Sequence, residues 1–264
     1  MLRGMCTLAI FREVAPGLPL IVAANRDEYL VRAADAPCSL KDVPGVVAGR
    51  DREAGGTWLG ARRDGGALVA GLLNRRLPGT AASSIPGTRS RGLLCLDALG
   101  GVDVDTALAA IDPARGGGPV LTDYSRFNLL LADPSRAVVV DNGSGTEVRH
   151  TELGPGLSVL TNLDVNDPRC PRLASAVPRF EEVAARFRDG VLVKELAGLL
   201  QPLLGSHESS LDPSEFDELS RLCIHTDGYG TRSSTILAYD DRGRLHYFHA
   251  DGAPCRAQFR EIRL

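Results

Sequence analysis

Short apolar runs separated by turn-forming residues dominate this chain, and they predict pairs of antiparallel strands. Residues 6–11 (C-T-L-A-I-F) and 19–25 (P-L-I-V-A-A-N) predict a first hairpin, because the E-V-A-P-G between them contains turn residues. Residues 57–63 and 67–74 predict a second hairpin, after a loop rich in Pro, Gly, Asp and Arg at about 31–56. Further strands are expected at 127–133, 136–141, 146–150, 157–161, 234–239 and 244–249.

Amphipathic segments with helical spacing lie between these strands in two groups. The helices are expected at residues 90–99, 103–111, 172–187 and 191–204. Ser90 and Asp103 are candidate N-caps of the first two helices. Hairpins and helices that follow one another in blocks disfavour a parallel doubly wound sheet, and they favour two antiparallel sheets with the helices outside. No internal repeat, low-complexity segment or linker interrupts the chain, so we expect a single domain over residues 1–264.

The composition is that of a globular protein and gives no sign of a nucleic-acid partner. Hydrophobic residues make up 44% of the 264 residues and charged residues 24%, which leaves enough apolar side chains for a sizeable core. The net charge of -3 and the scattered arginines argue against a phosphate-binding surface. Residues 18–24 are apolar but too few to span a bilayer, and no signal-peptide run is present. We therefore expect a cytoplasmic protein without membrane insertion.

The spacing of cysteines and histidines predicts free thiols and no bound metal. The six cysteines are Cys6, Cys38, Cys95, Cys170, Cys223 and Cys255. No two of them are close enough in sequence to form a CxxC motif. His246 and His249 are three residues apart on a predicted strand, so they should face opposite sides of the sheet. We expect no structural zinc, no disulfide framework and no cofactor.

Four charged or polar residues follow directly on the apolar I-V-A-A of the second strand. This N-R-D-E motif at 25–28 is either a strand leaving the core into solvent or a polar cluster beside the partner strand. Cys6 begins that partner strand, and in a hairpin the start of one strand lies beside the end of the other. Cys6 and residues 25–27 should therefore lie close together. An acidic group there can hold an α-ammonium, and an arginine can lower the pKa of a thiol.

Other candidate site residues lie at strand ends and in glycine-rich segments. Residues 55–60 (G-G-T-W-L-G) predict either a core tryptophan in a tight turn or a backbone loop near a pocket. Asn74 and Asn162 each end a strand, where asparagine serves as a turn former or as a donor to an oxyanion. Arg232 lies among small and hydroxylated residues in a setting that suits an anion. His225, just upstream, is either structural or a base.

Six motifs in a fixed order together resemble the NRDE family, also called the transport and Golgi organisation 2 family. They are M-C-T at 5–7, N-R-D-E at 25–28, G-G-T-W-L-G at 55–60, F-N-L-L at 127–130, T-N at 161–162 and Y-G-T-R-S-S-T-I at 229–236. The resemblance covers about residues 5–264. The family in turn is similar to the N-terminal nucleophile hydrolases. This implies an α+β fold, a four-layer αββα sandwich of two antiparallel sheets.

The resemblance implies that Cys6 is a nucleophile whose own α-amine acts as the base. Asp27 matches the aspartate that related cysteine acylases place near that amine. Those acylases carry an arginine a few residues before this aspartate, whereas Arg26 directly precedes it here. Because residues 1–4 and Met5 come before Cys6, the free amine requires either that translation starts at Met5 or that a leader is removed.

The resemblance also implies a substrate-binding set later in the chain. Asn74 and Asn162 match the oxyanion and substrate-binding asparagines of the related acylases, and Arg232 matches their late arginine, which stabilises the thiolate. The leading hypothesis is an N-terminal cysteine hydrolase or acyltransferase that acts on a C–N amide bond of a small molecule. Its specificity is expected in the loops at 31–56 and 75–89.

Two non-enzymatic hypotheses remain open at this point. In one, the protein is an intracellular binding or trafficking protein for haem or an acyl lipid and does not need a free Cys6 amine. The candidate haem ligands would then be His225, Cys6 and Tyr229. In the other, the protein acts through a protein partner in trafficking, which leaves the polar N-R-D-E cluster unexplained.

Overall fold

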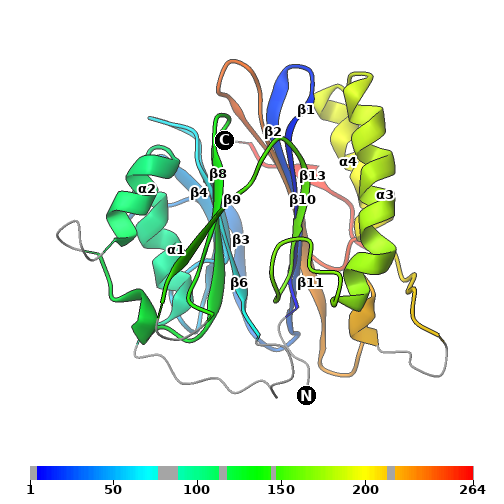
Figure 1. Cartoon of the computed structure of the whole chain (residues 1–264), viewed down its shortest axis with the longest axis horizontal. Helices are drawn as coiled ribbons and strands as arrows, with labels where there is room; N and C mark the ends of the chain where they lie inside the picture. Colours follow the sequence, from blue (N-terminus) through cyan, green and yellow to red (C-terminus); the bar gives the residue numbers. More distant parts are fainter. Residues whose placement is uncertain (1–4, 77–88, 113–117, 144–146, 213–217, 264) are drawn as a thin grey trace.

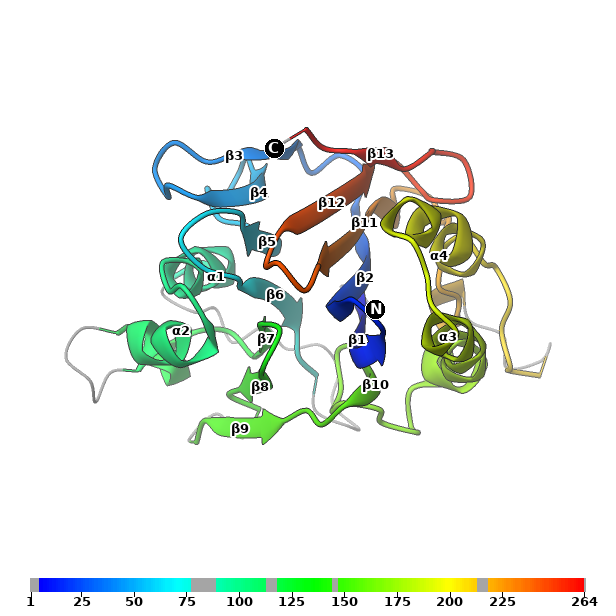
Figure 2. The same ribbon diagram turned by 90° about the horizontal axis from the view of Figure 1, so that it is seen from above.

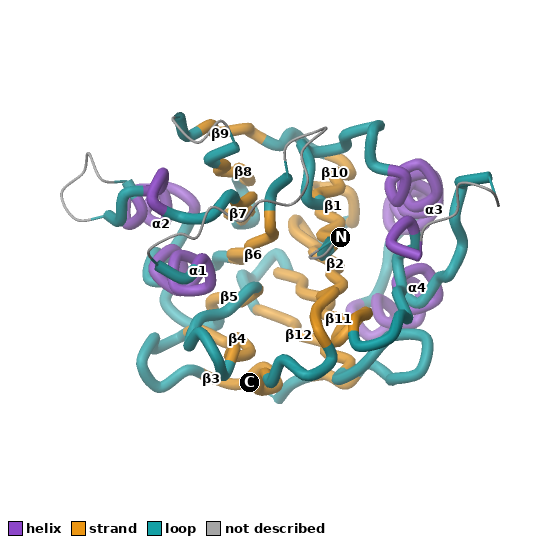
Figure 3. The backbone as a smooth tube through the Cα atoms, turned by 90° about the horizontal axis from the view of Figure 1, so that it is seen from below, coloured by secondary structure: helices purple, strands orange, loops and turns teal. Residues whose placement is uncertain are grey.

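The computed structural model of the chain describes residues 5–76, 89–112, 118–143, 147–212 and 218–263. Two antiparallel sheets pack face to face, and a pair of helices covers the outer face of each sheet (Figure 1). Figure 2 shows the two helix pairs on opposite sides of the strand layers, and Figure 3 shows the same arrangement from below. The predicted α+β fold, a four-layer αββα sandwich, is therefore confirmed.

One sheet has six strands and carries the N-terminal hairpin. Its spatial order is β10 (Gly156–Leu160), β1 (Thr7–Ala15), β2 (Leu18–Tyr29), β11 (Tyr229–Tyr239), β12 (Leu245–Ala250) and β13 (Arg260–Glu261). In the hairpin, Thr7 pairs with Asn25, so the residue before Thr7 lies next to the N-R-D-E motif, as the sequence predicted. The helices α3 (Pro171–Arg188) and α4 (Leu196–Leu204) cover this sheet.

The other sheet has seven strands in sequence order. They are β3 (Ala34–Ser39), β4 (Val46–Asp51), β5 (Leu59–Arg62), β6 (Val69–Asn74), β7 (Phe127–Ala132), β8 (Ala137–Asp141) and β9 (Arg149–Glu152). The helices α1 (Arg91–Leu99) and α2 (Val104–Ile111) cover it. Asp103 caps α2 in a reciprocal pair with Thr106, whereas the Ser90 side chain makes no capping bond to α1. None of the helices among the described residues is both long and apolar enough to cross a membrane.

The alternation of side chains along β1 and β2 produces two of the three apolar layers. Leu8 and Ile10 point between the sheets, whereas Phe11 points toward the helices. The Phe11 ring contacts Phe180 and Phe187 of α3 edge-on, with ring centroids 6.1 and 5.1 Å apart. A third apolar layer lies between α1, α2 and the seven-stranded sheet. Both strands are therefore buried on both faces over most of their length.

Several predicted boundaries were wrong because strand pairing overrides local composition. The segment at 31–56, predicted as a loop, contains β3 and β4. β3 lies at the edge of the sheet and carries the polar residues typical of an edge strand, and β4 pairs with both β3 and β5. The N-R-D-E motif lies inside β2 rather than beyond its end, and β11 already begins at Tyr229. The second helix of the later pair begins at Leu196.

Candidate active-site cleft

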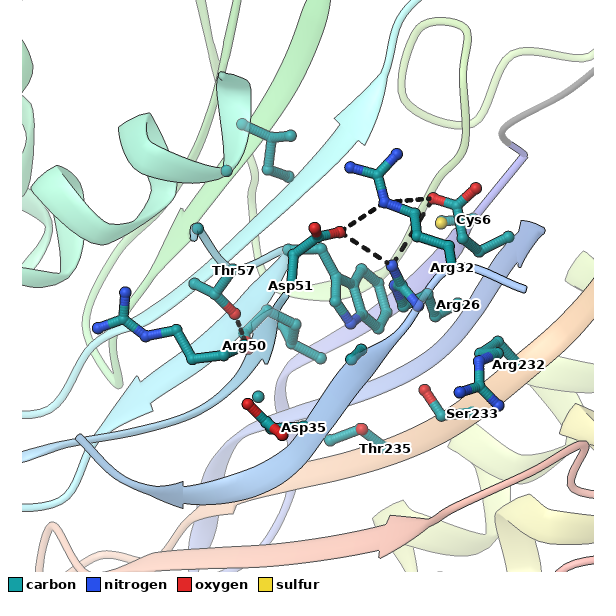
Figure 4. A pocket seen from close by; sticks show the side chains of 18 of the residues that line it. Cys6, Arg26, Arg32, Asp35, Arg50, Asp51, Thr57, Arg232, Ser233 and Thr235 are labelled. Carbon is teal, nitrogen blue, oxygen red and sulfur yellow. Dashed lines mark hydrogen bonds and ion pairs between the residues drawn. The ribbon is translucent and has the colours of Figure 1, made fainter. Parts of the chain in front are cut away.

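A cleft of about 280 Å³ lies between the two sheets, at one of their ends (Figure 4). Its walls come from β2, β11 and β12 of the six-stranded sheet and from β3, β4, β5 and β6 of the opposite sheet. The first turn of α1 closes one side. Among the sequence-predicted site residues, the structure brings together Cys6, Arg26, Asp27, Asn74 and Arg232 around this cleft.

The N-R-D-E motif serves two sides of the sheet because alternate residues of β2 face opposite ways. Arg26 and Glu28 face the cleft. Asn25 faces the helices, where its side-chain amide donates to the carbonyls of Leu204 and Leu222 at 2.8 and 2.9 Å. Leu204 is the last residue of α4, so this asparagine satisfies a helix-terminal carbonyl. Asn25 thus fixes the helix layer to the sheet and contributes no group to the cleft.

Asp27 forms a fully buried ion pair with an arginine that the sequence did not predict. Arg172, at the start of α3, donates to Asp27 at 2.7 Å, and both side chains are inaccessible to solvent. The hydroxyl of Thr231 donates to the other Asp27 oxygen at 2.7 Å. Burial raises the pKa of Asp27, and the charge of Arg172 and the Thr231 hydroxyl oppose this increase. Arg172 also donates to the backbone carbonyl of Met5, which attaches the residue before Cys6 to this pair.

The side chain of Cys6 lines the cleft and is half-buried. Its Sγ lies 3.7 Å from the backbone carbonyl of Asp27. Burial, and then the negative charge of Asp27, raises the pKa of the Cys6 thiol to about 12, although Arg26 opposes the increase. The backbone N–H of Met5 donates to the hydroxyl of Tyr229 at 3.3 Å. While Met5 remains attached, Cys6 is therefore a protonated thiol without an amine of its own.

Two arginines near Cys6 share carboxylates across the cleft (Figure 4). Arg26 lies 3.5 Å from Asp51 and 3.7 Å from Glu28, and Arg32 lies 2.6 Å from Asp51. Arg26 belongs to β2 and Asp51 to β4, so the pair that they form joins the two sheets across the cleft. One buried N–H group of Arg26, at Nη1, has no hydrogen-bond partner among the described residues. This group is available to an acceptor on a ligand.

Arg232 and Arg91 bring positive charge to the cleft without an acidic partner among the described residues. Arg232 is the extra residue of a β-bulge, because Thr231 pairs with Asp27 and Ser233 pairs with the adjacent Arg26. Its buried Nε has no hydrogen-bond partner in the described part of the chain. Arg91, in the first turn of α1, donates within the described part of the chain only to a backbone carbonyl, at 2.8 Å, and burial lowers its pKa. These two cations make the cleft suited to an anionic group.

The two predicted asparagines have different positions. Asn74 ends β6 and lines the cleft. Asn162 is buried and is not among the lining residues, and its backbone carbonyl accepts from the N–H of Arg76 at 2.7 Å. This contact places the two asparagines on neighbouring segments. Most of the predicted specificity loop at 75–89 lies outside the described residues.

His249 also lines the cleft and was not predicted as a site residue. Its Nδ1 lies 3.0 Å from the hydroxyl of Thr235. Burial lowers the pKa of His249 to about 4, while the nearby charge of Asp251 opposes the decrease, so the imidazole is neutral at pH 7. His225, the predicted alternative base, is not among the residues that line the cleft.

The missed residues came from segments far from the motifs. Arg172 is 145 residues from Asp27, and the sequence around it shows only an amphipathic helix. Arg91 begins a helix, where a surface position is the usual expectation. The sequence predicted a helix that starts near Arg172, directly after Pro171, but nothing in it indicated that Arg172 would contact a site residue.

Comparison with known proteins agrees with this architecture. The family model described as transport and Golgi organisation 2 matches residues 5–251. The human transport and Golgi organization protein 2 homolog is 29% identical over 250 residues, which cover 86% of this chain and 84% of that protein. The Drosophila melanogaster transport and Golgi organization protein 2 is 23% identical, covering 92% and 90%.

A solved structure shares the fold over nearly the whole length. It is that of a Caenorhabditis elegans N-acylethanolamine-hydrolyzing acid amidase ortholog, an N-terminal nucleophile hydrolase fold. Its TM-score to this chain is 0.54 at 14% identity, and the match covers 98% of this chain and 100% of that one. The sequence match over residues 5–251 shows that the chain belongs to the transport and Golgi organisation 2 family.

Proposed function

We propose that the chain, once it begins at Cys6, is an N-terminal cysteine hydrolase or acyltransferase that acts on a C–N amide bond of a small molecule. One observation carries the proposal. The Cys6 side chain opens into the cleft, while the peptide group before it lies against the buried pair of Asp27 and Arg172. At the backbone nitrogen of Cys6, the nucleophilic side chain thus lies on one side and the carboxylate of Asp27, which can hold an amine, lies on the other.

Removal of the residues before Cys6 would complete this arrangement. Met5 is followed by the small residue Cys6, and such a pair suits removal of an initiator methionine. The carbonyl of Met5 now accepts from Arg172, so the new α-amine would arise next to the ion pair that holds Asp27. Proton transfer from Sγ to that amine would then generate the thiolate. In the unprocessed chain the pKa of the Cys6 thiol is too high for the thiolate to form at neutral pH.

Hydrolysis needs no reactant besides the amide substrate and water, and acyl transfer needs an acceptor amine in place of water. The Cys6 thiolate attacks the amide carbon, the new S–C bond forms, and the carbonyl oxygen takes the negative charge. We assign Asn74, which lines the cleft, as the donor that stabilises that oxygen. The C–N bond then breaks, the leaving amine takes the proton held by the α-amine, and a thioester remains. Water releases the acyl group as a carboxylic acid, or an acceptor amine takes it as a new amide.

The charges and apolar surface of the cleft support an amide substrate that carries an acidic group. Arg91 and Arg232 are the cations without an acidic partner among the described residues. Trp58, Leu72 and Tyr247 supply apolar surface on the same walls. Asn162 and Arg26 remain predicted contributors to substrate binding and to the thiolate, respectively.

A second function is favoured for any form that keeps residues 1–5. In that form Cys6 has no free amine and its thiol pKa is raised to about 12, so the cleft would bind an anionic or acyl-lipid ligand without reaction. The positions of the three candidate haem ligands do not favour haem. Of the three candidate ligands only Cys6 lines the cleft, since the Tyr229 hydroxyl accepts from Met5 and His225 lies elsewhere.

The test compares two forms of the protein, expressed from Met1 and from Met5, after intact-mass analysis. The substrates are short N-acyl amides with and without a carboxylate, and the released amine is measured by a fluorogenic reaction. We expect hydrolysis only by the form that begins at Cys6, and we expect Cys6→Ala to lose at least about a thousandfold in rate. The exposed Cys38 provides a matched control, because Cys38→Ala removes a thiol outside the cleft.

Two outcomes would contradict the enzyme proposal, and a third would identify the ligand of the form that keeps residues 1–5. A form that begins at Cys6 and keeps its activity as Cys6→Ala would show that another group does the chemistry. Failure of the Cys6 form to release amine from any amide would favour the binding function. Haemin binding by the Met1 form, seen as a Soret shift that Cys6→Ala abolishes, would restore haem as the ligand.

A further inference from the structure

Four metal-ligating side chains converge outside the cleft, at the helix-covered side of the six-stranded sheet. His207 follows α4, Cys223 and His225 precede β11, and Cys255 follows β12. Their ligand atoms all lie within 4.8 Å of one another. None of the four lines the active-site cleft. The sequence predicted no metal because no CxxC spacing is present, and three separate loops build this cluster instead.

The distances within the cluster match the edges of a tetrahedron around a zinc ion. With Zn–S near 2.3 Å and Zn–N near 2.0–2.1 Å, ligand atoms at tetrahedral angles are about 3.4–3.8 Å apart. The Sγ atoms of Cys223 and Cys255 are 3.6 Å apart, and Cys223 Sγ is 3.7 Å from His225 Nε2. The remaining measured edge, from His225 Nε2 to Cys255 Sγ, is 3.1 Å and needs a shift of only about half an ångström.

The second ring nitrogen of one histidine is already fixed. Nδ1 of His207 lies 3.0 Å from the backbone carbonyl of Cys223, which leaves Nε2 for the ion. A backbone carbonyl on the other ring nitrogen is the usual support of a zinc-bound imidazole. The rings of His207 and His225 face the same space, with centroids 5.1 Å apart. Cys223 is buried whereas His207 and Cys255 are exposed, so an ion can reach the cluster from solvent.

A disulfide explains the cluster less well than a metal does. The 3.6 Å between the two Sγ atoms is far longer than the roughly 2.05 Å of an S–S bond. A disulfide would also leave unexplained why two imidazoles approach the same sulfurs. Two thiolates and two imidazoles are a soft, four-coordinate donor set that suits Zn²⁺.

We propose that His207, Cys223, His225 and Cys255 bind one Zn²⁺ in a structural Cys₂His₂ site. Binding releases the two thiol protons and leaves no open coordination position for a substrate. The ion ties the loop after β12 to the segment before β11. Ile224 lies in that segment, between Cys223 and His225. Its N–H donates to the hydroxyl of Thr231, which in turn donates to Asp27. The site therefore clamps the backbone that supports the active-site carboxylate.

The test uses the full chain purified under reducing conditions, with metal content measured by mass spectrometry. We expect close to one zinc per chain, and we expect Co²⁺ exchanged into the site to give thiolate charge-transfer absorption and the visible bands of tetrahedral cobalt. Cys255→Ser and His207→Gln alter exposed ligands and should each lose most of the zinc. Cys38→Ser and His150→Gln are matched controls at exposed positions outside the cluster and should keep it.

The Co²⁺ spectrum of the unchanged chain keeps the proposal testable even where a variant fails to fold. A chain that binds neither Zn²⁺ nor Co²⁺ at equimolar metal would overturn it. So would zinc retained by both cluster variants, or a Cys223–Cys255 disulfide found by peptide mass mapping in the purified protein. Removal of zinc by a chelator should lower the melting temperature of the unchanged chain but not that of Cys255→Ser.

Discussion

Replacement of Arg172 by methionine should destabilise the protein strongly, although the side chain lies outside the cleft. Arg172 is fully buried and donates to the Asp27 carboxylate, the Thr7 hydroxyl and the backbone carbonyls of Met5 and Leu219. Methionine fills similar space but donates no hydrogen bond. The substitution therefore leaves a buried carboxylate without its counter-charge and removes the partner of three other acceptors.

The expected cost is about 3–5 kcal/mol of unfolding free energy, the range found when one partner of a buried ion pair is removed. The unpaired carbonyls add to the same loss, at about 1 kcal/mol each, unless water enters. Asp27→Leu removes the unpaired carboxylate and should relieve part of this loss. The double variant Asp27→Leu/Arg172→Met should therefore be destabilised by at least about 2 kcal/mol less than the sum of the two single destabilisations. That difference is the coupling between the two charges.

The assay is urea unfolding at pH 7, followed by far-ultraviolet circular dichroism and by the fluorescence of Trp58, the single tryptophan. Arg179 is the matched control on the same helix, since its ion pair with Glu208 is partly exposed. Arg179→Met should cost at most about 1 kcal/mol. If Arg172→Met costs no more than this control, or if the double-variant coupling is zero, the reasoning about the buried pair is refuted.

Two further predictions concern the walls of the cleft. Because burial lowers the pKa of His249 to about 4, the unfolded chain binds the extra proton between about pH 6.5 and pH 4, so stability falls as pH falls through this range. Between pH 7 and about pH 5, the free energy of unfolding of His249→Gln should therefore fall by about 2 kcal/mol less than that of the unchanged chain. Urea unfolding at both pH values measures this difference, and equal decreases for the two proteins would contradict the prediction. A Cβ on Gly56 would lie 2.6 Å from Cα of Gly92, so Gly56→Ala should cost about 1–3 kcal/mol. Gly198→Ala, at an exposed helical position with open space around it, should instead stabilise the protein by about 0.5–1 kcal/mol. If urea unfolding shows that both substitutions stabilise or both destabilise the protein, the argument from the close contact of Gly56 with Gly92 is contradicted.

The sequence by itself determined the layers of this protein and one side of its cleft. The apolar runs at 6–11 and 19–25 specified the hairpin, and the hairpin brought Cys6 beside Asp27, because the register of two strands joined by a short turn is a local property. The motif order then predicted the sandwich. The strands at 34–39 and 46–51 were missed, because their pairing partners, rather than their own composition, make them strands.

Only the tertiary structure decided what surrounds the nucleophile. Arg172 reaches Asp27 from 145 residues away, and the bulge that turns Arg232 into the cleft arises from the pairing of β11 with β2. The meeting of Cys223 with Cys255 likewise depends on two loops that share no sequence pattern. Side-chain periodicity reports which face of an element is buried, whereas ion pairs and ligand sets depend on distances between elements. Those distances are fixed only when the layers pack.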